Sequence, residues 1–285
     1  MSSDCTTVTL EQGDYPKALT HYAQSLNLAL EIGYQLSVSV NIGNMGTVYL
    51  EQGDDANAGA CYAYNLYLSM QLGDLFGVSF ALWYIAMAAM NQRRYREAGR
   101  LLARAATLAR SLDIPYELSA YLLTHAELYA TQENYAEAQP LNDEALKIAE
   151  EMGFDDILFK TRVLAIRLAV LLGQTLLAAG CEALEALLTP ALDERQRALI
   201  HYTLAQLDPG QEAHRLQAVD LYRQLYVTSS EIEFKRRYQA LTGETLPDPP
   251  PLPPLPEIVT RQQFDIEQLI RQADALITEL EAQSG

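Results

Sequence analysis

The stretch "NIGNMGTVYLEQGDDANAGACY", residues 41–62, contains the pattern that decides the fold. Small and apolar residues recur at helical spacing before its central corner: Ile42, Met45, Gly46 and Tyr49. Gly53 suits the left-handed position that follows a helix, and Asp54 suits the N-cap of the next one. The stretch therefore predicts two helices joined by a sharp turn.

The corner returns with a period of 40 residues. Its copies read "QGDYPKA", "QGDDANA", "QRRYREA", "QENYAEA" and "LGQTLLA". The alanines in register are Ala18, Ala58, Ala98, Ala138 and Ala178. A second series, at the other end of each helix pair, consists of Gly33, Gly73, Asp113 and Gly153. Asp14 and Asn134 stand at the N-cap position of Asp54. The register predicts helix pairs at this spacing from about residue 13 to 190, without strands.

Small residues within each pair allow the two backbones to approach. Gly46, Ala86 and Ala126 occupy one register position before the corner, and the larger Tyr49 and Tyr129 fill the space beside them. These side chains serve packing, and the pattern itself contains no catalytic residue. The repeat therefore predicts the architecture of the fold and does not by itself indicate a catalytic function.

The pattern resembles the tetratricopeptide repeats. The residues that carry the resemblance are Ile42, Met45, Gly46, Tyr49, Ala58 and Tyr62, with a second copy at Leu122, His125, Ala126, Tyr129 and Ala138 and a weaker third at Leu82, Ile85, Ala86, Ala98 and Leu102. Asn142 replaces the usual aromatic residue of the second copy. The resemblance implies an all-α, right-handed solenoid of antiparallel helix pairs. The family's usual period is about 34 residues and a proline closes each repeat, whereas this chain has the longer period without that proline. Such long repeats are similar to those of kinesin light chains and of the sensor regions of bacterial signalling ATPases and transcription activators.

Three segments are expected: a repeat array over 1–245, a Pro-rich linker over 246–256, and an amphipathic helix over 257–285. The last one or two repeats are atypical, and the basic run "FKRRY", 234–238, is interpreted as a solvated helix face. Residues 1–12 show little of the helical pattern, so the first repeat is incomplete. The chain is then a fragment of a longer protein, or it begins on a half-repeat that a partner covers.

The C-terminal helix is expected to begin at a capping box of Thr260 and Gln263. Its apolar stripe consists of Ile266, Leu269, Ile270, Ala273, Leu276, Ile277 and Leu280. Such a stripe must be buried, and three arrangements stay open: folding back on the array, pairing with a second copy, or docking on another protein. For folding back, the C-terminal repeats are the expected surface.

Composition narrows the class of partner. The chain has 37 acidic and 20 basic residues and a formal charge of −17, which disfavours nucleic acid and anionic membranes. Cys5, Cys61 and Cys181 form no CxxC pair, so neither a disulfide framework nor a zinc site is predicted. The sequence shows neither a signal peptide nor an apolar run that could span a bilayer. A cytoplasmic location is expected.

Motifs for catalysis are missing from the sequence. It contains no GxxxxGK[ST], HExxH, GxSxG or GxGxxG. His125 and Glu127 form an HxE without the PCxxC of zinc deaminases, and the register gives His125 a packing position. The four histidines lack metal-ligand spacing with one another. No catalytic residue, metal or cofactor is predicted, and the chain is expected not to be an enzyme.

The resemblance implies that the first helix of each pair lines a concave groove. The projected groove residues are Asn44, Thr47, Trp83, Met87, Leu123, Glu127, Val163 and Arg167. Only Asn44 matches the family's carboxylate clamp. Trp83 is either an interface anchor or a filler between helices. The leading hypothesis is a protein-protein interaction module that binds a peptide or partner helix. The alternative is a ligand- or partner-sensing regulatory region of a larger bacterial signalling protein.

Overall fold

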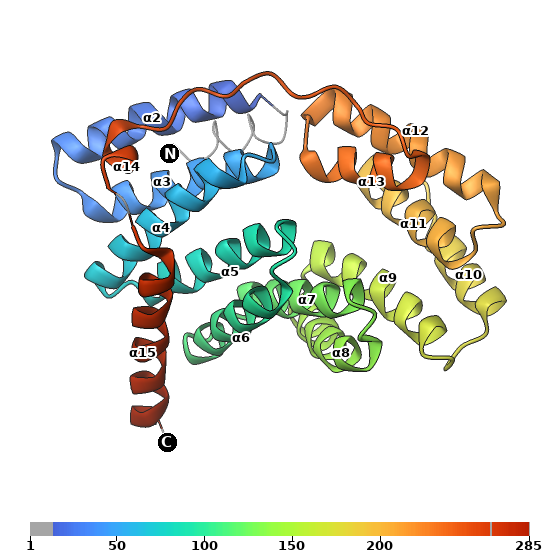
Figure 1. Cartoon of the computed structure of the whole chain (residues 1–285). Helices are drawn as coiled ribbons and strands as arrows, with labels where there is room; N and C mark the ends of the chain where they lie inside the picture. Colours follow the sequence, from blue (N-terminus) through green and yellow to red (C-terminus); the bar gives the residue numbers. More distant parts are fainter. Residues whose placement is uncertain (1–13, 263, 285) are drawn as a thin grey trace. The chain divides into compact units, whose positions relative to one another are not determined.

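The computed structural model describes residues 14–262 and 264–284, and all regular secondary structure within them is helical (Figure 1). The helices are α2 (Tyr15–Glu31), α3 (Gln35–Glu51), α4 (Asp55–Leu72), α5 (Leu75–Asn91), α6 (Tyr95–Ser111), α7 (Pro115–Thr131), α8 (Tyr135–Met152), α9 (Asp155–Leu171), α10 (Leu177–Ala186), α11 (Glu194–Leu207), α12 (Glu212–Ser229), α13 (Ile232–Thr242), α14 (Glu257–Thr260) and α15 (Ile266–Ser284). Successive helices pack as antiparallel pairs, as in an α-solenoid. The predicted all-α class is confirmed.

The predicted period is confirmed through α9. The even-numbered helices α2, α4, α6 and α8 begin at residues 15, 55, 95 and 135, and the odd-numbered helices α3, α5, α7 and α9 begin at 35, 75, 115 and 155. The predicted first half-repeat, residues 1–12, lies outside the described residues. Each repeat consists of an odd helix followed by an even one.

The corners use the predicted chemistry with two exceptions. Gly53 has a φ of 79°, and Asp54 accepts a hydrogen bond from the backbone N–H of Asn57 at 3.1 Å. Arg93 and Glu133 take the same left-handed conformation without being glycines. Asn134 stands at the N-cap of α8, as predicted, although its side chain makes no capping hydrogen bond.

Close backbone approach holds each pair together. A Cβ on Gly46 would lie 2.9 Å from Cε1 of Tyr62 and 3.0 Å from Cβ of Cys61, which is too close for any larger residue without displacement. Ala58 is fully buried in the same pair, and Ala98 and Ala138 are fully buried in the next two. The small residues therefore have the packing role that the sequence predicted.

The register ends after α9. Ala178 is exposed, and the buried face of the short helix α10 is formed instead by Gly180, Cys181 and Leu184. The predicted alignment of Ala178 with the other four alanines is therefore wrong. The physical reason is that α10 is only 10 residues long and follows an extended residue, Leu176, so it presents a different face to its neighbours.

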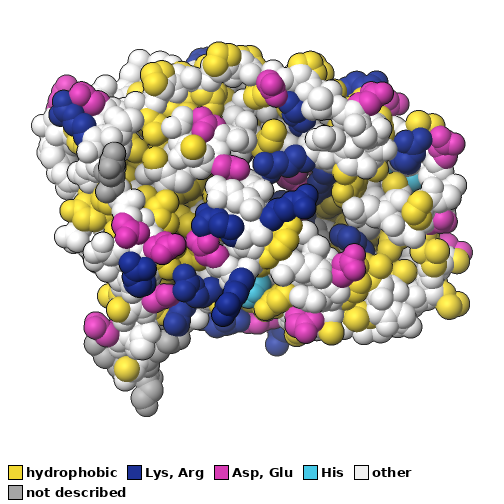
Figure 2. All heavy atoms as spheres, viewed as in Figure 1, with side chains coloured by type: hydrophobic (Ala, Val, Ile, Leu, Met, Phe, Trp, Pro, Cys, Tyr) yellow, Lys and Arg dark blue, Asp and Glu magenta, His cyan; other side chains and the backbone are white. Residues whose placement is uncertain are grey.

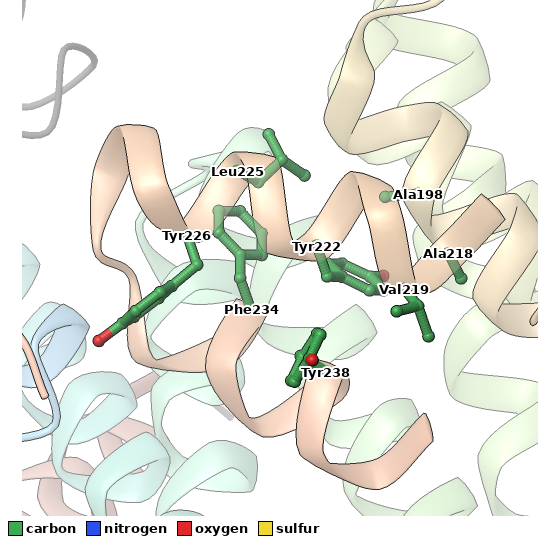
Figure 3. Packing of buried hydrophobic residues seen from close by; sticks show 8 residues of the cluster. All are labelled: Ala198, Ala218, Val219, Tyr222, Leu225, Tyr226, Phe234 and Tyr238. Atoms are coloured by element: carbon green, nitrogen blue, oxygen red, sulfur yellow. The ribbon is translucent and has the colours of Figure 1, made fainter. Parts of the chain in front are cut away.

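The last three helices of the array share an aromatic core (Figure 3). Tyr222 of α12 and Phe234 of α13 stack with ring centroids 5.9 Å apart. Lys235 is buried, and its Nζ donates to Oδ1 of Asp248 at 2.6 Å and to the carbonyl of Pro247 at 3.3 Å. The interpretation of residues 234–238 as a solvated face is therefore wrong, because Phe234, Lys235 and Tyr238 all point inward.

The chain divides into two compact units, and the boundary falls within α7. Unit 1 comprises Met1–Tyr121 and Pro250–Gly285, and unit 2 comprises Leu122–Pro249. The C-terminal tail thus belongs to the unit that contains the N-terminal repeats. The two units are described separately below.

Within unit 1 the tail folds back on α4 and α6. Its buried side chains are Val259, Leu269, Ile270, Ala273 and Ile277. The Phe264 ring lies 5.5 Å from that of Tyr64, Tyr49 donates its hydroxyl proton to the carbonyl of Pro253 at 2.8 Å, and Arg104 pairs with Asp274 at 3.2 Å. Folding back is therefore the observed arrangement. The predicted surface is wrong, because the tail covers N-terminal rather than C-terminal repeats.

The start of the tail helix also differs from the prediction. Thr260 ends α14 instead of capping a longer helix, and Gln263 lies outside the described residues. Asp265 accepts from the backbone N–H of Gln268 at 3.1 Å, at the beginning of α15. Self-association through this helix stays a prediction, and it would require the apolar stripe to leave α4 and α6.

Replacing Ala58 by leucine is expected to destabilise the fold by about 1–3 kcal/mol, because the added side chain has no room between α3 and α4. The matched control is Ala178→Leu, at the register position that the structure exposes, where the effect should stay within about 0.5 kcal/mol. Urea denaturation of both variants measures the difference. Equal destabilisation by the two substitutions would show that the register does not end after α9.

Candidate functional site

The accessible side chains of the odd-numbered helices form what we call the odd-helix face. In unit 1 this face is aromatic. Ring centroids of Phe80 and Tyr84 lie 4.6 Å apart, Trp83 and Tyr84 are 4.6 Å apart, and Trp83 and Tyr121 are 5.2 Å apart. The rings lie on successive turns of α5 and extend to α7. We call these four rings the aromatic ladder. Trp83 is partly exposed within it.

Thr47 supports the ladder from α3. The Tyr62 hydroxyl donates to Oγ1 of Thr47 at 3.2 Å, and the Tyr62 and Tyr84 rings stack at 4.9 Å with planes 13° apart. Burial raises the pKa of Tyr84 to about 12, an effect that its hydrogen bond with Thr47 opposes. Tyr84 therefore stays a neutral phenol at physiological pH, and Thr47 acts as a polar anchor beneath the aromatic surface.

Three exposed side chains recur at one register position of consecutive odd helices. Leu36, Phe76 and Tyr116 are 40%, 45% and 43% exposed, and each lies in the first turn of α3, α5 or α7. Val40, one turn further along α3, is 51% exposed. The sequence analysis missed this row. The sequence does contain a signal for this row. Large apolar residues recur there every 40 positions, outside the set of positions that pack against the paired helix.

In unit 2 the odd-helix face is charged. Glu127 of α7 interacts electrostatically with Lys160 and Arg167 of α9 and with Arg237 of α13. Its side chain reaches solvent, yet the surrounding protein raises its pKa by desolvation, and the three basic groups oppose that shift. The nearby carboxylate of Glu233 also raises the pKa of Glu127, and we call Glu127, Glu233 and the three basic groups the charged hollow.

Arg237 organises the α13 side of this hollow. It pairs with Glu233, donates to the Tyr222 hydroxyl at 2.7 Å, and lies over the Tyr202 ring with its guanidinium carbon 5.2 Å from the centroid. Arg237 is the main cause that lowers the pKa of Glu233. Arg195 similarly binds both carboxylate oxygens of Glu231. Figure 2 shows basic side chains gathered among acidic ones on the face in view, in contrast with the strongly negative net charge.

The eight predicted groove residues fall into three groups. Asn44, Thr47, Trp83 and Met87 are partly buried in unit 1, whereas Glu127 and Arg167 belong to the charged hollow of unit 2. Leu123 and Val163 are only 4% and 3% exposed. Their side chains pack in the interior, so the structure gives no accessible surface to these two predicted positions.

No group of three or more His, Cys, Asp or Glu side chains in the described residues could hold a metal ion. The structure does bring together two histidines that the sequence analysis treated as unrelated. Nδ1 of His201 lies 2.9 Å from Nδ1 of His214, whose Nε2 lies 3.3 Å from Oε1 of Glu185. Three different helices supply these groups, which explains why sequence spacing did not reveal the contact.

No protein-family model and no curated protein matches the chain. Solved structures with a similar fold include a Rap protein complexed with competence and sporulation factor, 15% identical, with a TM-score of 0.61 over 84% of this chain and 72% of that one. The apo form of RapI is 14% identical, with a TM-score of 0.60 over 82% of each chain. BtubC from P. vanneervenii is 15% identical, with a TM-score of 0.50 over 86% of this chain and 97% of that one. At such identities the likeness shows the helical-repeat fold alone.

Among the described residues, none of the helices has both the length and the apolar character that a membrane span requires. Cys61 and Cys181 are buried free thiols. Burial raises the pKa of both thiols, which disfavours the nucleophilic thiolate.

His125 is expected to make unit 2 sensitive to acid. It is buried beside Tyr129, with ring centroids 4.9 Å apart, and burial lowers its pKa below the ordinary value of 6.5. Because the folded state favours the neutral imidazole, this contribution to stability is complete above pH 6.5 and is lost as the pH falls toward the folded-state pKa. His125→Phe should therefore lose less stability than the wild type between pH 7 and pH 5. Urea denaturation at both pH values measures the difference, and equal losses would contradict the assignment.

Proposed function

We propose that the chain is a non-enzymatic protein-protein interaction module of the tetratricopeptide kind, which binds a peptide or partner helix on its odd-helix face. The observation that carries the proposal is the partly exposed Trp83 within the aromatic ladder of α5. Large aromatic side chains are frequent energetic anchors of protein interfaces. The adjoining row of Leu36, Phe76 and Tyr116 supplies the apolar surface around such an anchor.

The chemistry of the face favours a protein segment over other partners. Aromatic rings and exposed apolar side chains in unit 1 suit apolar residues of a helix or an extended peptide. The formal charge of −17 opposes binding to phosphate backbones and anionic lipids. The charged hollow of unit 2 can select among segments by electrostatic complementarity.

The structural likenesses support this proposal at the level of the fold. One of the similar structures is a Rap protein complexed with competence and sporulation factor, so a fold of this kind can carry a bound partner. The identity of the partner does not transfer at 15% identity. A cytoplasmic setting fits the proposal, because the buried free thiols Cys61 and Cys181 are stable in a reducing compartment.

Trp83→Ala should weaken partner binding more than it weakens the fold. Loss of an aromatic anchor worth about 2 kcal/mol corresponds to a loss of affinity of about thirtyfold. The partner is first captured from an extract of the source cells with the full chain, and its affinity is then measured by titration calorimetry alongside melting temperatures.

Leu28→Ala is the matched control, because Leu28 is a 59% exposed apolar residue of the even-numbered helix α2. It should leave the affinity within about twofold. If Trp83→Ala lowers the melting temperature strongly and leaves the affinity unchanged, Trp83 fills space between helices and the proposed site is wrong. Equal effects of both variants on binding would also contradict it.

A further inference from the structure

A cavity of about 600 Å³ lies within unit 1, between α4, α5 and the C-terminal tail. Gly59 and Ala60 of α4 and Ala88 of α5 form part of its floor, and Val259 and Phe264 of the tail form part of the opposite wall. Ligand pockets commonly have volumes of about 300–1,000 Å³. The cavity is therefore large enough for a small molecule, and it lies away from the odd-helix face.

Gly59 is unusual for its position. It lies inside α4, where glycine is a poor helix former. At Gly46 and Gly77 an added Cβ would collide with neighbouring side chains, but at Gly59 it would meet nothing within 4 Å. Gly59 also has no left-handed backbone that would require glycine. Neither packing nor backbone conformation explains this residue, and its effect is to deepen the cavity.

Polar side chains line two parts of the cavity wall, and Thr260 and Gln262 of the tail form one of them. Asp55, Gln92 and Arg94 line the end near the corner between α5 and α6. Arg94 pairs with Glu97 at 2.6 Å, and Asp55 accepts from Nδ2 of Asn91 at 3.1 Å. Glu97 balances the charge of Arg94, but Asn91 is a neutral amide and does not balance the carboxylate of Asp55. This end can therefore hydrogen-bond a neutral head group, and it disfavours an anionic one.

We propose that this cavity binds an uncharged amphiphile, an elongated hydrocarbon with one hydroxyl or amide head. The hydrocarbon lies on the α4 backbone at Gly59, beneath Val259 and Phe264, and the head hydrogen-bonds at the end formed by Asp55 and Gln92. Because such a ligand contacts the array and the tail together, it stabilises the docked tail by mass action. The site is independent of partner binding on the odd-helix face.

Titration of the full chain with 1-decanol tests the site, with thermal unfolding followed by circular dichroism. We expect a saturable rise in melting temperature. Gly59→Leu fills the cavity and should weaken 1-decanol binding at least tenfold. Gln71→Leu adds the same side chain at an exposed position of α4 outside the cavity and should bind as the wild type does. Decanoate, which has the same chain length and a charged head, should bind more weakly than 1-decanol.

Two further variants decide the result if Gly59→Leu does not fold. Gly59→Ala should raise the melting temperature of the free protein, because alanine favours the helix and its methyl group meets open space. Ile270→Asp detaches the tail and should abolish saturable 1-decanol binding. The proposal is overturned if 1-decanol causes no saturable shift, if folded Gly59→Leu binds it as well as the wild type, or if Ile270→Asp still binds it.

Discussion

The close contact between the odd and even helices of one repeat is the constraint on which the array depends. At Gly46 the α3 backbone lies so near Tyr62 and Cys61 of α4 that a methyl group has no space. Ala58 is the fully buried small residue that the even helix α4 contributes to the same helix pair. Ala86 and Ala126 stand at the register position of Gly46 in the next two pairs and are fully buried, so a small residue occupies this contact in each of these pairs. Side chains at one register position therefore recur at the same place on each odd helix.

The repeat fixes positions and leaves the chemistry of the face free to vary. The register position of Met87 in unit 1 is occupied by Glu127 and Arg167 in unit 2, and Lys160 stands at the position of Phe80. These residues are exposed or only partly buried, unlike the small residues at the contact within each helix pair. An aromatic surface in one unit and a charged hollow in the other can thus arise on the same scaffold. This separation explains how the fold can be shared at 15% identity.

The sequence predicted the fold where periodic small residues control packing, and it failed where packing is irregular. Helix spacing, corners and the buried position of His125 followed from the register. The exposure of Ala178 did not, because α10 is short and turns Gly180 inward instead. Lys235 was misjudged since its partner, Asp248, lies beyond the helix in the proline-rich segment.

The candidate site was likewise predicted only where its residues follow the helical register. Projection from the repeat identified Trp83 and Glu127 as members of the face, because both follow helical register. It also placed Leu123 and Val163 on or near the groove wall, and the structure buries both side chains. Their burial depends on the neighbouring helices. The contact between His201 and His214 could not be predicted from the sequence either. Hydrogen bonds between side chains of separate helices depend on side-chain rotamers as well as on register.

The placement of the tail shows how few contacts can select one surface among several. The proline-rich stretch 247–256 spans about 30 Å in the polyproline II conformation, so many surfaces of the array lie within reach. Burial of Ile270 and Ile277 favours any apolar groove and does not choose between grooves. The choice comes from contacts with directional geometry: the Phe264 ring against Tyr64, the hydroxyl of Tyr49 on the Pro253 carbonyl, and Arg104 with Asp274. The ion pair is partly solvated and adds little energy by itself. Its effect is to fix the position of α15 along α6, while Tyr49 and Phe264 fix the segment before it, and the cavity lies beneath that held segment.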